Sequence, residues 1–181
     1  MSTQGIPATF RHLSMTGGLR AAAGRDPGKV AYRHGDRERR YGELVDRIDR
    51  VSAALMGELG LGPGEHGAIV SKNSIEYMEL VFGASQAGVA LATINPRLSP
   101  AEVAAICDDA GARVLFVDEQ SADALADTRF ATVQRRVVIG KEFETWLAAA
   151  NPRAARPDVP EWGVFTIPYT SGTTGKPKGV M

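Results

Sequence analysis

Cysteine, histidine and net charge are all scarce in this sequence, and each shortage excludes a class of protein. The single cysteine, Cys107, cannot form an internal disulfide and fits a reducing compartment. Lysine plus arginine and aspartate plus glutamate number 21 each, so bulk charge favours neither nucleic acid nor an anionic membrane as a partner. We therefore expect no nucleic-acid partner.

Long apolar runs are missing as well. The first residues lack the basic segment and apolar stretch of a secretory signal, and no run approaches the length that spans a bilayer. Together with the lone cysteine, this predicts a cytoplasmic protein without a transmembrane segment.

The histidines and the cysteine do not form a pattern that binds metal. His12, His34 and His66 lie far apart, with no partner four residues away and no Cys-x-x-Cys motif nearby. Cys107 falls on one helical face with the apolar residues of 103–110, which favours core packing over nucleophilic catalysis. We predict no metal site.

The paired carboxylates and the serine of the C-terminal segment do not form patterns typical of catalytic acids or nucleophiles. Asp108 and Asp109 end a predicted helix, and Glu76 and Glu79 are expected on the solvent side of another. Ser171 lacks the G-x-S-x-G setting of a hydrolase nucleophile. No catalytic residue is therefore expected in this chain from its acids or serines.

Strand and helix patterns alternate along the 181 residues, 44% of which are hydrophobic, enough for one sizeable core. The expected strands span residues 30–34, 39–41, 66–71, 89–94, 113–118, 136–139 and 164–167. The expected helices lie around 9–23, over 44–55, from 73, over 99–111, over 122–126 and over 143–150. This alternation predicts an α/β fold, with a mostly parallel sheet covered by helices on both faces.

Local signals mark two helix starts and one surface turn. Asn73, with Glu76 three residues later, predicts a capping box. Ser99 and Glu102, with a proline between them, predict another. The arginine-rich turn around residues 35–40 is expected to be solvated surface.

The segment 169–181, YTSGTTGKPKGVM, has the residue types of a phosphate-binding loop. Its three glycines allow positive φ and let backbone N–H groups approach an anion closely. Its four Ser and Thr hydroxyls and two lysines add donors and positive charge. The apolar run 164–167 predicts a buried strand, so the loop should project from a strand's carboxyl end, where open α/β sheets bind ligands. This combination suits a polyphosphate.

The segment does not fit the common phosphate loop of nucleoside triphosphatases, G-x-x-x-x-G-K-S/T. Thr170 stands where the first glycine should be, and Pro177 where the magnesium-binding hydroxyl should be. It closely resembles the signature loop of the adenylate-forming superfamily, which includes acyl-CoA synthetases, firefly luciferase and the adenylation domains of peptide synthetases. That pattern, Y/F-T-S-G-S/T-T-G-x-P-K-G-V, is met here at every specified position.

The resemblance runs upstream through nearly the whole chain. Residues 39–55 look like the family's first conserved helix, and residues 70–88 are similar to its segment with N-S after the second strand. Residues 94–118 match the acyl-CoA synthetase version, with its N-P-R-L-x-P-x-E core. The resemblance implies that residues 1–181 are a partial N-terminal AMP-binding domain, with the phosphate loop 169–181 at its end and the mobile C-terminal domain absent.

The resemblance also implies a reaction with two halves. A carboxylate attacks the α-phosphorus of ATP to give an acyl-adenylate and pyrophosphate, and the thiol of coenzyme A then takes the acyl group as a thioester. Mg²⁺ is the implied cofactor. The residues implied to hold the β and γ phosphates are Thr170, Ser171, Gly172, Thr173, Thr174 and Gly175, with Lys178 as the charge partner. Lys176, at a variable position, is expected to face solvent, and Tyr169 to anchor the loop.

The family's magnesium-binding glutamate, ribose-binding aspartate and catalytic lysine follow this loop, so the 181 residues are expected not to catalyse adenylation alone. Three alternatives stay open: part of an acyl-CoA synthetase, part of a carrier-protein-loading adenylation domain, or a non-catalytic remnant. The carboxylic acid is left unspecified. An exposed sheet edge would favour self-association.

Overall fold

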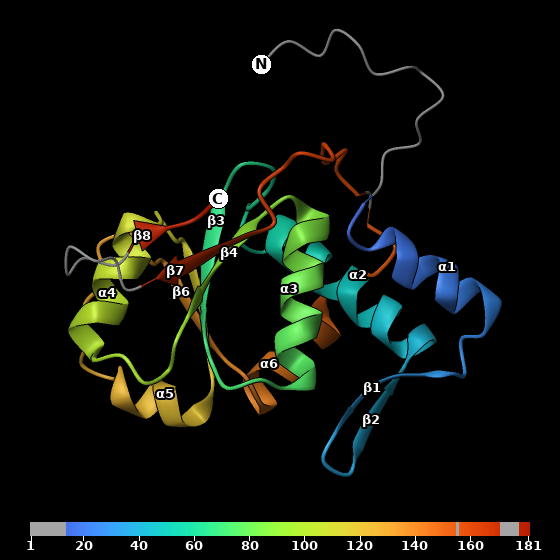
Figure 1. Cartoon of the computed structure of the whole chain (residues 1–181), viewed down its shortest axis with the longest axis horizontal. Helices are drawn as coiled ribbons and strands as arrows, with labels where there is room; N and C mark the ends of the chain where they lie inside the picture. Colours follow the sequence, from blue (N-terminus) through green and yellow to red (C-terminus); the bar gives the residue numbers. More distant parts are fainter. Residues whose placement is uncertain (1–13, 155, 171–177) are drawn as a thin grey trace, which may run out of the picture.

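The six-stranded sheet of this protein carries helices on both faces, as the computed structural model shows (Figure 1). The structure describes residues 14–154, 156–170 and 178–181. The strand order is β6-β5-β3-β4-β7-β8, in which β8 is antiparallel to β7 and the other neighbours are parallel. The strands are β3 (His66–Val70), β4 (Ala90–Ile94), β5 (Val114–Val117), β6 (Arg135–Val138), β7 (Thr166–Thr170) and β8 (Lys178–Gly179). The predicted α/β fold with a mostly parallel sheet is confirmed.

Two hydrophobic cores, one on each face, hold the helices to the sheet. The first core lies under α2 (Tyr41–Gly57), α3 (Ile75–Ala87) and α6 (Lys141–Ala149). The second lies under α4 (Pro100–Asp109) and α5 (Glu119–Ala124). Figure 1 shows the sheet between these two groups of helices. Because both faces are covered, the central strands β3 and β4 are buried along most of their length, and all of β5 is buried.

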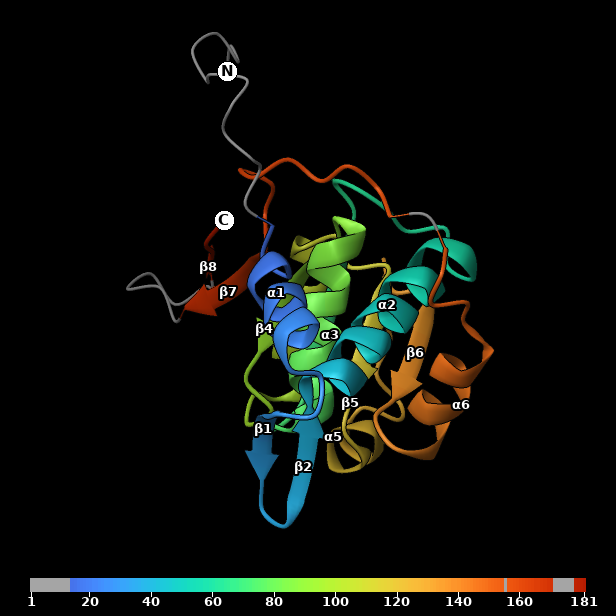
Figure 2. The same cartoon turned by 90° about the vertical axis from the view of Figure 1, so that its right-hand side faces the viewer.

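Helix α1 (Gly17–Arg25) and a separate antiparallel hairpin, β1 (Val30–His34) with β2 (Arg37–Arg40), lie outside the main sheet. Helix α1 packs on α2, and the hairpin contacts α2 and α3, as Figure 2 shows. The expected hairpin is confirmed, but its second strand ends at Arg40, and Tyr41 already begins α2.

Helices α2 and α3 pack closely enough to leave no room for a side chain at Gly83. The predicted apolar stripe of α2 is fully buried, from Leu44 to Leu55. Gly83 of α3 makes the approach possible, since a Cβ there would lie 2.4 Å from the Cβ of Val51. A side chain at residue 83 would therefore separate the two helices.

The two predicted capping boxes have different outcomes. At α4, Ser99 Oγ accepts the N–H of Glu102, whose carboxylate accepts the N–H of Ser99 at 2.8 Å, as predicted. At α3 the prediction is wrong by one residue: Ser74 is the N-cap, and its hydroxyl accepts the Tyr77 N–H at 3.0 Å. With Ser74 as the N-cap, the third helical residue is Tyr77 and not Glu76, and Glu76 pairs with Arg37 of the hairpin.

The solvent-side position expected for Glu76 and Glu79 is also wrong. Both are buried, and the side chain of Glu79 is fully inaccessible. The Nε of Arg39 donates to Glu79 Oε1 at 2.8 Å, and the Nε of Arg47 lies 2.6 Å from Oε2. Burial raises the pKa of Glu79, against the opposing pull of Arg47 and Arg39. The arginine-rich turn is therefore partly a set of partners for α3 and not only solvated surface.

Cys107 and His66 have structural surroundings. Cys107 is fully buried in the second core, and burial raises its thiol pKa to about 12, as expected of a packing residue. His66 Nδ1 lies 2.7 Å from the carbonyl oxygen of Ala110, which can only accept, so Nδ1 carries the proton. In the part of the chain that the structure describes, no helix combines the length and apolar character needed to cross a bilayer.

Replacing Glu79 by alanine should lower the free energy of unfolding by about 3–5 kcal/mol, because two largely buried guanidiniums would lose their shared carboxylate. Glu144→Ala is the matched control: it removes the exposed partner of Arg47, at a cost of about 0–1 kcal/mol. Urea unfolding of the two variants measures the difference. Equal losses of unfolding free energy in the two variants would show that the buried carboxylate contributes no more to stability than the exposed one.

Candidate functional site

Strand β7 places the start of the predicted phosphate loop at the carboxyl edge of the parallel sheet. It pairs with β4, with Thr93 opposite Pro168, so Tyr169 and Thr170 continue to the end of β4 and beyond. The predicted strand over 164–167 is displaced: β7 begins at Thr166, and Val164 is 37% exposed. Thr170, which the sequence assigned to the loop, is the last residue of this strand.

Strand β8 returns antiparallel to β7 and brings two of the predicted site residues together. Tyr169 is opposite Gly179, and Thr170 is opposite Lys178. The N–H of Val180 donates to the Pro168 carbonyl at 3.0 Å and extends the ladder. The other predicted phosphate-binding residues lie outside the described residues: Ser171, Gly172, Thr173, Thr174 and Gly175.

The ladder has one packed face and one open face. Side chains alternate along a strand, so Ile167 and Tyr169 share the face toward α4, while Thr170 and its partner Lys178 share the opposite face. Ile167 is buried, whereas Thr170 and Lys178 are exposed. The open face therefore presents a hydroxyl and an ammonium group side by side.

Tyr169 is fastened on the packed face by helix α4. Its hydroxyl donates to Asp109 Oδ2 at 2.6 Å, and burial together with this carboxylate raises the pKa of Tyr169. Its ring lies over Gly179, where a Cβ would come within 3.0 Å of Cζ and 2.9 Å of Ile167 Cγ2. This arrangement agrees with the anchoring role expected for Tyr169.

Charged groups at the ends of the neighbouring strands β3 and β5 form hydrogen bonds with nearby residues. Asp118, after β5, accepts the N–H groups of Ser121 at 2.8 Å and Lys72 at 3.0 Å. Burial opposes ionisation of Asp118, but these hydrogen bonds outweigh it and lower the pKa. The Nζ of Lys72 donates to Gln120 Oε1 at 2.9 Å. These groups orient α5 and do not supply a free acid or base to the open face.

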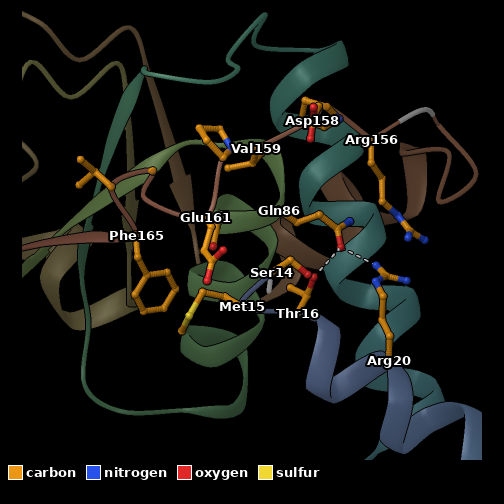
Figure 3. Close-up of a pocket in the computed structure, with 15 residues that line it drawn as sticks. Ser14, Met15, Thr16, Arg20, Gln86, Arg156, Asp158, Val159, Glu161 and Phe165 are labelled. Atoms are coloured by element: carbon orange, nitrogen blue, oxygen red, sulfur yellow. Dashed lines mark hydrogen bonds between the residues drawn. The ribbon is translucent and has the colours of Figure 1, made fainter. Parts of the chain in front are cut away.

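A hollow of about 300 Å³ lies on another part of the molecule, between the start of α1, the end of α3 and residues 156–165 (Figure 3). Gln86 at its wall accepts hydrogen bonds from Thr16 and Arg20 and donates to Asp49 at 2.7 Å. Arg156 also donates to Asp49, at 3.2 Å. Sequence reasoning missed this junction, because its members come from four separate segments and no motif joins them.

Among the described residues, no three carboxylate, imidazole or thiol groups come together in a way that could hold a metal ion. Among the described residues of the site, the exposed hydroxyl of Thr170 and the exposed ammonium group of Lys178 are chemically able to contact an anion, and they flank residues 171–177.

Comparison with known families and proteins gives a family match and several similar chains. The family model described as AMP-binding enzyme matches residues 19–181. The fatty acid–acyl-carrier-protein ligase ScoC of Streptomyces coeruleorubidus is 35% identical over 146 residues, covering 78% of this chain and 27% of the relative. A long-chain-fatty-acid–CoA ligase of Thermus thermophilus is 35% identical over 147 residues, with the same coverages of 78% and 27%.

Solved structures of acyl-CoA ligases have the same fold. The inhibitor-bound N-terminal domain of FACL13 from Mycobacterium tuberculosis matches with a TM-score of 0.80 and 30% identity, over 90% of this chain and 42% of that one. The anthranilate CoA ligase AuaEII, in complex with anthranoyl-AMP, matches with a TM-score of 0.83 and 27% identity, over 90% and 33%. The chain spans about a third or less of the curated relatives, 27% for both ligases described above.

Replacing Gly179 by alanine should loosen the β7–β8 ladder, because the new methyl group would meet Ile167 and the held ring of Tyr169. Overpacking of this kind costs about 1–3 kcal/mol. Hydrogen exchange at the Val180 amide, which donates across the ladder, should therefore accelerate roughly tenfold or more.

The control is Gly62→Ala, since nothing lies within 4 Å of a Cβ at that position. It should leave Val180 exchange unchanged. Unaltered exchange in Gly179→Ala would contradict the proposed close packing of the ring on the glycine.

Proposed function

Because the chain belongs to the AMP-binding enzyme family, we propose that its signature segment binds the phosphates of ATP as part of an acyl-CoA synthetase. The observation that carries this proposal is the pairing of Thr170 with Lys178 across the β7–β8 ladder. The two residues flank the glycine- and hydroxyl-rich segment 171–177, so both ends of that segment start from one exposed face.

In this proposal the lysine and the hydroxyl have distinct roles. Lys178 is a compact positive charge that neutralises the β and γ phosphates, and Thr170 donates a hydrogen bond to a phosphate oxygen. Residues Ser171–Gly175 would add hydroxyl and backbone N–H donors. The described residues thus fit a polyphosphate. Mg²⁺, bound with the nucleotide, would supply further charge neutralisation at the phosphates.

The proposed reaction joins a carboxylic acid to a thiol. The carboxylate attacks the α-phosphorus of ATP and pyrophosphate leaves. The thiol of coenzyme A then attacks the acyl carbon of the adenylate, loses its proton and forms a thioester, while the acyl–phosphate bond breaks and AMP leaves. Phosphoryl chemistry of this kind depends on positioning and charge neutralisation more than on covalent help from the protein. The part that this chain's own residues play is to hold the leaving pyrophosphate.

A second candidate acceptor is a carrier protein. The 35% identity to ScoC, which is named as an acyl-carrier-protein ligase, favours it as much as the equal identity to the Thermus ligase favours coenzyme A. Both acceptors share the adenylation half and the phosphate site. Self-association through the sheet edge also stays a prediction, one that fits the exposed Val180 and Met181 beside β8.

Lys178→Ala should weaken the binding of ATP·Mg²⁺ by roughly 10- to 100-fold, as expected for losing one hydrogen bond to a charged group. Calorimetric titration of the 181-residue chain measures the affinity. Lys176→Ala is the matched control, because it removes the same charge two residues away at a position given no role; its effect should stay below about threefold.

Equal losses in the two lysine variants would show that only bulk charge matters and would contradict the assigned role of Lys178. Absence of saturable binding at millimolar nucleotide would contradict phosphate binding by the chain itself.

We also propose that these 181 residues alone do not catalyse adenylation. Purified chain, supplied with ATP, Mg²⁺ and a panel of aliphatic and aromatic carboxylic acids, should release no pyrophosphate above the rate without acid. The positive control is a longer protein in which the same residues are followed by the remainder of a family enzyme. Steady release of pyrophosphate by the 181 residues that depends on the carboxylic acid would contradict this proposal.

A further inference from the structure

We infer that Asp109, at the end of helix α4, is a positioning residue for the phosphate site: by holding Tyr169 it sets the orientation of Thr170 and Lys178. This inference rests on the proposed binding of ATP by the signature segment. Asp109 would touch neither nucleotide nor acid, and acts through the hydroxyl of Tyr169.

The first step is that Asp109 belongs to a firmly held helix. Helix α4 starts in the Ser99–Glu102 capping box and buries Val103, Ile106 and Cys107 in the second core. The residue before Asp109 makes a separate connection: Asp108 Oδ1 accepts the N–H groups of residues 131 and 132, at 2.8 and 3.1 Å. The end of α4 is thus fixed by contacts that do not involve β7.

The second step is that the Tyr169–Asp109 hydrogen bond is one residue away from the site residue Thr170. Tyr169 immediately precedes Thr170, and its ring lies against Gly179, which immediately precedes Val180 and follows Lys178. A hydrogen bond of 2.6 Å from a phenol to a carboxylate is short and charge-assisted, so it restricts the ring more than a contact with water would. Restricting the ring restricts both strands of the ladder.

The third step is that the ladder needs such a tether. Strand β8 is two residues long and pairs with β7 at two positions. A two-stranded ribbon of this size is marginal in water. The open face that carries Thr170 and Lys178 has no covering element among the described residues, so the packed face supplies the restraint.

The same geometry separates a positioning role from a merely structural one. The hydrogen bond lies at the exposed end of α4, so its loss should leave global unfolding almost unchanged. Its effect should instead fall on the order of the ladder and on nucleotide affinity. A core residue such as Val117 should behave in the opposite way, because it is fully buried and distant from the ladder in the sheet order.

The experiment compares Asp109→Ala, Asp109→Asn, Tyr169→Phe and the double variant Asp109→Ala/Tyr169→Phe in the 181-residue chain. The probes are ATP·Mg²⁺ titration, Val180 amide exchange and urea unfolding. Asp109→Ala and Tyr169→Phe should each weaken ATP affinity by roughly 3- to 10-fold and speed Val180 exchange. Asp109→Asn should restore part of the affinity, because its amide oxygen still accepts a hydrogen bond.

The double variant should lose no more affinity than whichever single variant loses more, since both substitutions break the same hydrogen bond. Asp127→Asn removes an exposed carboxylate in the turn that follows α5 and should change neither affinity nor exchange. Val117→Ala should lower the urea midpoint and leave the affinity of the folded chain unchanged.

Wild-type affinity in Asp109→Ala, alongside lost affinity in Lys178→Ala, would overturn the positioning role and leave the proposed function standing. If the wild-type chain binds no ATP, the proposed function fails and the positioning role for a phosphate site fails with it. Val180 exchange then tests only whether Asp109 tethers the β7–β8 ladder. Faster exchange in Asp109→Ala supports the tether, and unchanged exchange overturns it.

Discussion

A buried carboxylate, Glu79, is the constraint that links α2, α3, α6 and the β1–β2 hairpin on one face of this sheet. It sits on the crossover helix between two adjacent parallel strands, where an unpaired charge would be strongly destabilising. Arg39 brings the hairpin to it and Arg47 brings α2, and Arg47 also makes a two-point contact with Glu144 of α6. The same guanidinium lies 5.7 Å from the centre of the Phe143 ring. The hairpin, α2 and α6 are therefore positioned against α3 by contacts made with Glu79 directly or through Arg47.

Periodicity predicted the parts of the fold that depend on one element at a time. The apolar stripe of α2 and the capping residues Ser99 and Glu102 are local patterns, and both have the predicted form. Glu79 could not be placed in this way, because the arginines that neutralise it lie some 30 to 40 residues earlier in sequence, and a carboxylate on a helix is ordinarily solvated. The start of α3 was misplaced by one residue: Ser74 is the N-cap, and the predicted capping residue Glu76 pairs instead with Arg37, which lies 39 residues earlier.

At the site, too, the residue types could be interpreted from the sequence, whereas their positions could not. The signature segment identified the chemistry from its glycines, hydroxyls and lysines, and the family assignment agrees with it. The ladder that sets Thr170 opposite Lys178 was not visible, because residues 178–179 alone carry no strand pattern. The bond from Tyr169 to Asp109 spans 60 positions, and the pair of aspartates had already been accounted for as a helix end. Contacts between residues distant in sequence thus decide which face of the β7–β8 ladder is exposed.

The order of strands also has a consequence for synthesis on the ribosome. Strand β4 acquires one neighbour, β3, from the chain that precedes it, but its other neighbour, β7, begins only at Thr166. At translation rates of about 5–20 residues per second, the edge of β4 stays unpaired for several seconds while β5, β6 and α6 emerge. An apolar strand with one open edge is a template for pairing with a second nascent chain. Strand β7, which carries Thr170 at the carboxyl edge of the sheet, is therefore also the strand that covers the open edge of β4 and ends its exposure to other nascent chains.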